Sequence, residues 1–324
     1  MRALAALAVA LALAGCGRSE QARERLSRAT ERPALGAFDW ERPDASLRMG
    51  ADEAAARIGS FDWECSISWG AASGLNGSRV HASERHHLRQ LSGGDFAVES
   101  DIDPGQGPGS ETGRRVVWAQ GMTYARSRYA PSGAWRERPT DRGRDARRFR
   151  DESFLAAAEV ADLLGGALKL VPKGDATALG RPARRYALVL DRQAFAAGPS
   201  RLGDSPPAGG ADEDTKRRLA FLDGREPLAA DGVLVADAAT GLPLELRLRA
   251  SFRVRDDPDA RVDVDVAARF TALGGGVGAV RVPPAVLPDE RKPKGVARAL
   301  EAAGLRKKKA PAGEGEAEQD SDSE

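Results

Sequence analysis

Two stretches of sequence decide the fold: Leu244-Glu-Leu-Arg-Leu-Arg-Ala-Ser-Phe-Arg-Val254 and Val262-Asp-Val-Asp-Val-Ala-Ala-Arg-Phe270. Apolar and polar residues alternate in both, which is the period-two pattern of a β-strand with one face in the core. Between them, residues 256–259 read Asp-Asp-Pro-Asp, a composition typical of turns. The pattern therefore predicts an antiparallel hairpin. In this hairpin, an arginine row is expected to face an aspartate row: Arg247, Arg249 and Arg253 against Asp263 and Asp265.

The rest of residues 51–300 follows the same pattern. Residues 61–69 alternate from Phe61 to Trp69, and further strands are expected at 79–91, 94–102, 114–119, 122–129, 134–138, 182–191 and 231–237. Helices are expected at 151–164, before Gly165-Gly166, and at 212–222 and 295–304. The order is strands, a helix, a pair of strands, a helix and three final strands. We therefore predict a mainly β fold with α: a large curved antiparallel sheet (an unclosed half-barrel) with helices packed in or over its concave face.

The first sixteen residues have the layout of a lipoprotein signal peptide. Met1-Arg2 is followed by an apolar run over residues 3–14 that is too short to span a bilayer as a helix. The run ends in Leu13-Ala-Gly-Cys16, which resembles the bacterial lipobox, so Cys16 is the expected lipidation site. Gly17 follows in place of an aspartate, which in such lipoproteins favours the outer membrane. We expect a lipid-anchored protein of the bacterial cell envelope that faces the periplasm, with a flexible tether over residues 17–50 and a disordered charged tail over 301–324.

Several turns in the body resemble a known family. These are Gly121-Met-Thr-Tyr124 opening a strand, Gly180-Arg-Pro-Ala-Arg-Arg-Tyr186 entering one, and Val235-Ala-Asp-Ala-Ala-Thr-Gly-Leu-Pro-Leu244 between two strands. Together with the element order, they resemble the LolA/LolB and LppX/LprG-like lipoprotein carriers. The resemblance implies an unclosed half-barrel that holds a lipid or a lipoprotein acyl chain. The ligand would contact apolar residues of the concave face: Trp63, Ile67, Trp69, Leu246, Leu248, Phe252, Val264 and Phe270.

The composition excludes several classes of function. There are 49 basic and 48 acidic residues, so no global field attracts nucleic acid, and the export signal also disfavours it. Two cysteines exclude a disulfide framework. With Cys16 acylated, Cys65 is expected to be a buried apolar thiol. The three histidines, His81, His86 and His87, are interpreted as a solvated strand face. No metal site, cofactor or catalytic signature is predicted, and the chain is not expected to be an enzyme.

One segment departs from the even charge distribution. Residues 114–150 contain eleven arginines against three acidic residues, with aromatic residues between them. Arginine forks bind phosphates and carboxylates, so Arg126, Arg128, Arg136 and Arg138 are candidates for an anionic patch. Arginine is also the usual basic residue of this chain, so a plain solvated role stays open.

Three functions remain in competition at this stage. The first is a membrane-anchored module that binds an apolar ligand. The second is a structural or sensory envelope lipoprotein that docks a protein partner and fills its concave face with its own side chains. The third is an enzyme. It would require a cluster of titratable groups, and the sequence contains no motif that indicates one.

Overall fold

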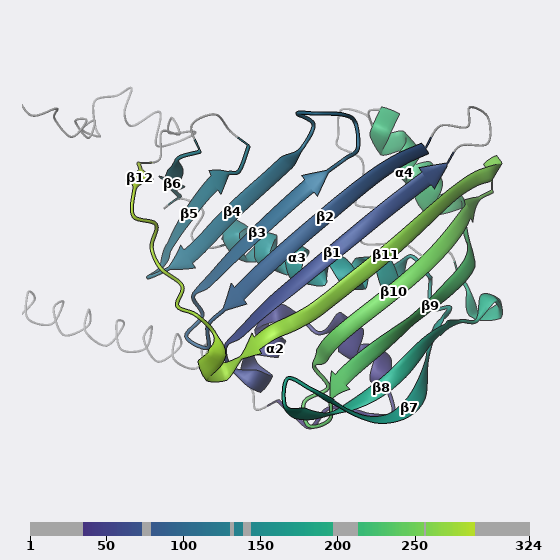
Figure 1. Ribbon diagram of the computed structural model, residues 1–324, viewed down its shortest axis with the longest axis horizontal. Coiled ribbons are helices and arrows are strands. Elements are labelled where there is room, and N and C mark those ends of the chain that lie inside the picture. Colours follow the sequence, from purple (N-terminus) through teal and green to yellow (C-terminus); the bar gives the residue numbers. More distant parts are fainter. Residues whose placement is uncertain are drawn as a thin grey trace, which may run out of the picture.

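The computed structural model describes residues 35–72, 79–129, 133–138, 144–196, 213–255 and 257–288 (Figure 1). These residues form one twelve-stranded sheet in the order β12-β6-β5-β4-β3-β2-β1-β11-β10-β9-β8-β7. Neighbouring strands are antiparallel, except β12 and β6, which are parallel. The sheet does not close, and its β7 end curls toward the helices. The predicted fold class is confirmed.

Most strands begin and end close to the positions expected from the alternation. Their bounds are β1 (Phe61–Ala72), β2 (Arg79–Gln90), β3 (Phe96–Asp103), β4 (Thr112–Ala119), β5 (Met122–Ser127), β6 (Trp135–Glu137), β7 (Leu168–Ala178), β8 (Arg181–Leu190), β9 (Arg225–Asp237), β10 (Pro243–Val254), β11 (Asp257–Leu273) and β12 (Val286–Leu287). The pairing of β7 with β8 shifts register between Pro172 and Asp175.

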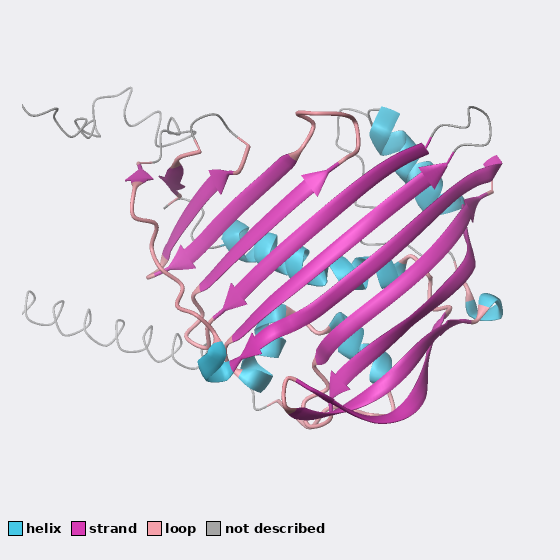
Figure 2. Ribbon diagram, viewed as in Figure 1, coloured by secondary structure: helices cyan, strands magenta, loops and turns pink. Residues whose placement is uncertain are grey.

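The helices are η1 (Pro43–Arg48), α2 (Ala51–Ile58), α3 (Arg144–Asp162), η3 (Arg192–Ala194), α4 (Glu213–Gly224) and η5 (Gly274–Gly276). The three α-helices lie on one side of the sheet, whereas η5 follows directly on the end of β11 (Figure 2). The longest, α3, crosses the middle of the sheet and packs on β1, β2, β3, β4 and β11. We call the side of the sheet that carries α3 the inner face and the opposite side the outer face. Figure 2 shows α2, α3 and α4 on the inner face.

The predicted hairpin forms between β10 and β11, with one of its expected ion pairs. Arg249 lies opposite Asp265, with 2.9 Å between Nε and Oδ2. The register sets Arg247 opposite Ala267. Arg253 instead pairs with Glu226 of β9, with 2.7 Å between Nε and Oε2. The alternation predicted which side chains share a face of the sheet. The ion-pair partner of each arginine depends on the strand register, which the alternation does not give.

The turn between β9 and β10 is organised by Asp237, which is 1% exposed. Its Oδ1 accepts hydrogen bonds from the backbone N–H groups of Ala239 (3.1 Å) and Thr240 (2.8 Å) and from the Thr240 hydroxyl (2.8 Å). Its Oδ2 accepts from Arg181 Nε at 2.5 Å. Gly241 follows at φ +71°, a conformation that favours glycine, and a side chain there would overlap the ring of Phe38.

The expected tether over residues 17–50 is corrected at its described end. Phe38, Ser46 and Met49 are buried in the domain. The Ser46 hydroxyl donates to the carbonyl of Gly241 at 2.6 Å, and thus ties η1 to the β9–β10 turn. Three buried residues among polar neighbours form too short a pattern to predict packing from sequence.

Other predictions fall outside the described residues. These are the signal peptide over residues 1–16, the tether over 17–34, the helix at 295–304 and the tail over 301–324. The helix expected at 151–164 begins earlier, at Arg144, and α2 was not expected at all.

Candidate functional site

The residues that the sequence assigns to the ligand all lie on the inner face. Buried among them are Trp63, Ile67, Leu246, Leu248, Phe252, Val264 and Phe270, and Trp69 is half-buried near the end of β1. They belong to, or pack against, one hydrophobic core cluster shared with the helices. The protein's own side chains therefore cover these residues.

Helix α3 covers the centre of the inner face through Phe154. The ring centroid of Phe154 lies 5.0 Å from that of Trp63, 5.6 Å from Phe61 and 6.1 Å from Phe270. Phe154, Ala157, Ala158 and Ala161 recur at three- and four-residue spacing, so a single helical stripe faces the strands. Small alanine side chains let the helix approach the sheet closely.

Helix α4 covers the inner face of β10, and its described side chains begin at residue 219. Phe221 packs edge-on against Phe252, with ring centroids 5.9 Å apart, and Leu222 is buried beside it. At its end, the buried Arg225 donates from Nε to the carbonyl of Leu163 at 2.9 Å and also donates to the carbonyl of Leu222. Burial lowers the pKa of Arg225. These contacts come from residues 219–225, which include the part of α4 whose side chains the structure describes.

A groove opens between the end of α3, η1 and the edge strand β7. Its volume is about 340 Å³, and its floor is apolar: Leu47, Ala158, Ala161, Leu168 and Leu170. Its rim is charged, because Arg48 lies 3.3 Å from Asp162 and 3.8 Å from Asp44. This groove lies beside the edge of the sheet, next to the helices of the inner face.

Buried His86 and Cys65 lie together with half-buried Glu84 on the inner face of β1 and β2. Glu84 accepts hydrogen bonds from Trp69 Nε1 at 3.0 Å and lies 3.4 Å from His86 Nε2. Cys65 lies directly opposite His86 on the neighbouring strand. The interpretation of the histidines as a solvated strand face is therefore wrong for His86, which is 8% exposed. Its Nδ1 has no hydrogen-bond partner among the described residues.

The chemistry of this buried group disfavours nucleophilic catalysis. Burial, assisted by the charge of Glu84, raises the pKa of the Cys65 thiol to about 12. Burial alone would raise the pKa of Glu84, but its hydrogen bonds with His86 and Trp69 outweigh burial and lower it. Cys65 is thus a protonated thiol at neutral pH, and the thiolate is the reactive form of cysteine.

The candidate anionic patch is divided between the two faces of the sheet. Arg126 and Arg128 lie on the outer face, where Arg126 stacks over Trp135 at 5.0 Å and Arg128 pairs with Glu99 and Asp101. Arg136 lies opposite the core residue Ala125, and so points to the inner face together with Arg138. A single patch of these four residues does not exist.

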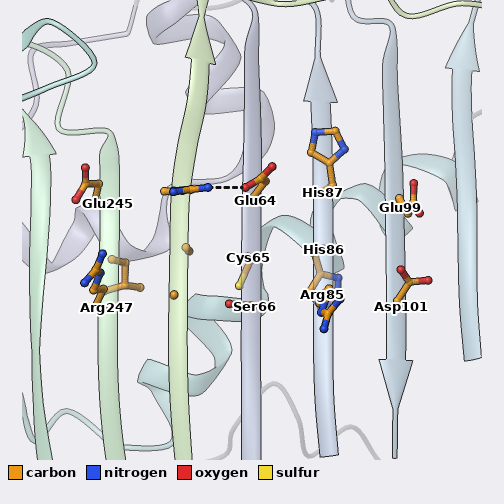
Figure 3. Close-up of a pocket in the computed structure, with 14 residues that line it drawn as sticks. Glu64, Cys65, Ser66, Arg85, His86, His87, Glu99, Asp101, Glu245 and Arg247 are labelled. Carbon is orange, nitrogen blue, oxygen red and sulfur yellow. Dashed lines mark hydrogen bonds and ion pairs between the residues drawn. The ribbon is translucent and has the colours of Figure 1, made fainter. Parts of the chain in front are cut away.

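The outer face carries a second hollow that the sequence did not predict (Figure 3). It has a volume of about 520 Å³ and crosses β10, β11, β1 and β2. One cross-strand row reads Arg247, Ala267, Ser66, Arg85, so two arginines flank a floor of small side chains. Neither Arg85 nor Arg247 makes an ion pair with any described residue, whereas Arg269 beside them pairs with Glu64 at 3.2 Å.

Two features are absent from the described ranges, a metal-binding cluster and a membrane-spanning helix. Within them, no three His, Cys, Asp or Glu side chains are grouped so that they could hold a metal ion. None of the described helices combines the length and apolar character needed to cross a bilayer.

Comparison with known proteins gives matches among solved structures only. No protein-family model matches the sequence, and no curated protein does. The chain is similar to lipoprotein LppX from Mycobacterium tuberculosis (10% identity, 75% of this chain and 100% of that chain, TM-score 0.28). It is also similar to LprF from Mycobacterium bovis (12%, 77% and 100%, TM-score 0.28). A third match is a putative outer membrane lipoprotein-sorting protein domain from Vibrio parahaemolyticus (8%, 71% and 94%, TM-score 0.21).

These matches include the kinds of lipoprotein to which the sequence was likened. At such identities and TM-scores the likeness carries no argument about this protein. What the protein does has to be argued from its own residues.

Proposed function

We propose that this protein is a lipid-anchored envelope protein that binds an apolar ligand, a lipid or a lipoprotein acyl chain, on the inner face of its half-barrel. The ligand enters by the groove beside β7 and displaces α4 from β10. The protein needs no cofactor for this role and catalyses no reaction.

The observation that supports the proposal is the small apolar area that the described side chains of α4 bury against β10. The described part of α4 buries Leu222, worth about 1.5–3 kcal/mol, and half-buries Phe221, worth about 1–2 kcal/mol. An acyl chain of about twelve methylenes gains about 0.8 kcal/mol for each one buried, which exceeds the cost of lifting α4 even after ordering costs. Helix α3 buries Phe154, Val160 and a row of alanines, so the same chain cannot displace it.

An arginine placed in the groove beside β7 tests whether the ligand enters there. Leu170→Arg is expected to weaken binding of a fluorescent fatty acid by about tenfold or more, because a charged side chain cannot be buried without a partner. Fluorescence titration of the full-length chain, made with Cys16→Ser so that it carries no anchor, gives the affinity.

The matched control is Val171→Arg, one residue along the same strand. Val171 is 39% exposed and does not line the groove, so the same charge there should leave the affinity unchanged. Equal losses in both variants would rule out the groove as the entrance. If the parent chain binds no fatty acid, and mass spectrometry of its organic extract finds no lipid, the carrier function fails.

The anchor has its own test in cells. Cys16→Ser is expected to abolish incorporation of labelled palmitate and to release the protein from the membrane fraction, because acyl chains supply the attachment. Incorporation that persists in Cys16→Ser would contradict the anchor. Gly17→Ala serves as the control and should keep both the label and the membrane attachment.

A second function, docking of a protein partner, is favoured by the hollow on the outer face. Arg85 and Arg247 stand unpaired there, on a face where other arginines have carboxylate partners. Crosslinking in the envelope separates the two functions. One dominant crosslinked protein that is lost in Arg85→Gln/Arg247→Gln, together with no bound lipid, would favour docking over carriage.

A further inference from the structure

Strand alternation gathers four arginines at the β6 end of the inner face. Arg114 of β4 lies on the inner face of the sheet, as do Arg136 and Arg138 at β6, and Arg147 reaches the same place from α3. We call these four residues the inner arginine cluster. Across the strands they span β4, β5 and β6, about 10 Å at the usual strand spacing, and along the strands Arg114 and Arg138 lie four residues apart, about 13 Å.

Two of these arginines contact aromatic rings instead of carboxylates. The guanidinium of Arg147 lies 5.7 Å from the ring centroid of Trp118, and that of Arg114 lies 5.1 Å from Phe149. Among the described residues, Arg114, Arg138 and Arg147 make no ion pair. On the outer face of the same strands, by contrast, Arg115 and Arg128 both pair with Glu99.

Two buried polar atoms in the cluster also lack partners. Thr123 is 2% exposed, and its Oγ1 has no hydrogen-bond partner among the described residues. Arg138 lies beside it, since its backbone N–H donates to the carbonyl of Thr123 at 2.8 Å, and its Nε is buried without a partner. Buried polar groups without partners are rare and costly, and a hydrogen-bonding ligand would satisfy them.

Among the described residues, few acidic side chains lie near Arg114, Arg138 and Arg147. No described residue on the inner face of β4, β5 or β6 is Asp or Glu. Asp145 of α3 makes no ion pair with any described residue, and Glu152 pairs with Arg148 at 2.7 Å. Like charges crowded at one place repel one another, so an anion bound here would remove repulsion as well as gain hydrogen bonds.

The cluster is continuous with the apolar inner face. Trp118, whose ring contacts Arg147, packs against the main hydrophobic core cluster. Val116 and Ala125, beside Trp118, belong to that core cluster. We propose that the inner arginine cluster binds the anionic headgroup, a phosphate or a carboxylate, of an amphiphile whose chain lies along the inner face. This inference rests on the proposed function and adds the chemical class of the headgroup.

Probes with one chain and different headgroups test the inference. Dodecyl phosphate, dodecanoate and uncharged dodecanol each displace a fluorescent alkyl probe from the full-length Cys16→Ser chain. We expect dodecyl phosphate to bind at least about tenfold more tightly than dodecanol, and dodecanoate to bind between them, because charge-assisted hydrogen bonds form only with the anions. The preference should weaken as salt is raised.

Substitutions then locate the preference. Arg138→Gln/Arg147→Gln is expected to reduce it to about threefold or less while dodecanol binding is unchanged. The matched control, Arg85→Gln/Arg247→Gln, removes the same charge from unpaired arginines of the outer face and should keep the full preference. Arg85→Gln/Arg247→Gln should leave the melting temperature unchanged, and Arg138→Gln/Arg147→Gln should lower it only slightly, by the loss of the contact between Arg147 and Trp118. Thr123→Val, which keeps the shape of the side chain, should lower the preference about twofold to threefold.

The outcomes separate this inference from the proposed function. If no probe binds, both fail. If all three probes bind equally, the headgroup site is overturned and the carrier function stands. If the preference for dodecyl phosphate over dodecanol is lost in Arg85→Gln/Arg247→Gln instead, the assignment of the headgroup site to the inner face is overturned. Inorganic phosphate is expected to compete poorly, and competition as strong as that of dodecyl phosphate would identify a free-phosphate site and overturn the lipid headgroup.

Discussion

Phe154→Ala is expected to lower the free energy of unfolding by about 3–5 kcal/mol, the range for a buried phenylalanine. The side chain fills the space between Phe61, Trp63 and Phe270, so its loss leaves a cavity lined by three aromatic rings. Because that cavity is apolar, it should stay dry and bind a small apolar molecule such as benzene. Urea unfolding measures the stability, and a shift of the midpoint on adding benzene measures the binding.

Phe221→Ala is the matched control on α4. Its ring is half-buried and meets Phe252 alone among the described aromatic rings, so about 1–2 kcal/mol should be lost. A cost for Phe154→Ala no greater than that for Phe221→Ala would contradict the conclusion that α3 is fixed to the sheet and α4 is the lighter cover.

Asp237→Ala is expected to cost about 3–4 kcal/mol, since a buried carboxylate that organises a turn is removed. Two backbone N–H groups and the Thr240 hydroxyl lose their acceptor, and Arg181 loses its partner. Differential scanning calorimetry should show a melting temperature about 10 °C lower, given about 2–4 °C for each kcal/mol in a domain of this size. A loss below about 1 kcal/mol would contradict the structural role of the turn.

The pH dependence of that cost follows from the pKa of Asp237. Burial alone would raise this pKa, but the hydrogen bonds from Arg181 and Thr240 outweigh burial and lower it below its usual value of about 3.9. A lowered pKa in the folded state adds stability above the unfolded pKa, and the contribution is lost as the pH falls through the folded value. The difference between the parent and Asp237→Asn, which keeps an acceptor but no charge, should therefore be constant near neutral pH and shrink below about pH 4.

How much of the fold could be predicted depended on the length of each pattern. The hairpin of β10 and β11 and the strand β1 alternate over nine or more residues, so both their existence and their buried faces were predicted. The buried residues of 38–49 are too few to form a period. In β7, Pro172 and Gly174 interrupt the alternation, so its bounds were not predicted.

The candidate site was predictable only where it is local to one strand. Alternation identified the inner apolar face, but not that α3 and α4 would cover it, because that requires contacts between distant parts of the chain. The division of the arginine-rich segment follows from strand phase: Arg126 and Arg136 lie on opposite faces because Ala125 is the cross-strand partner of Arg136. The outer hollow depends on β10, β11, β1 and β2 lying side by side, and this register is not visible in the sequence of any single strand.

The irregular last strand of the sheet has a consequence for solubility. An unclosed sheet ends in backbone groups that could recruit a strand from another molecule and begin aggregation. In β7, Pro172 removes one N–H donor from the ladder, the register shift before Asp175 distorts the backbone, and Lys169 and Lys173 add charge. The features that hid this strand from sequence analysis are thus the ones that keep the protein from polymerising through its open end.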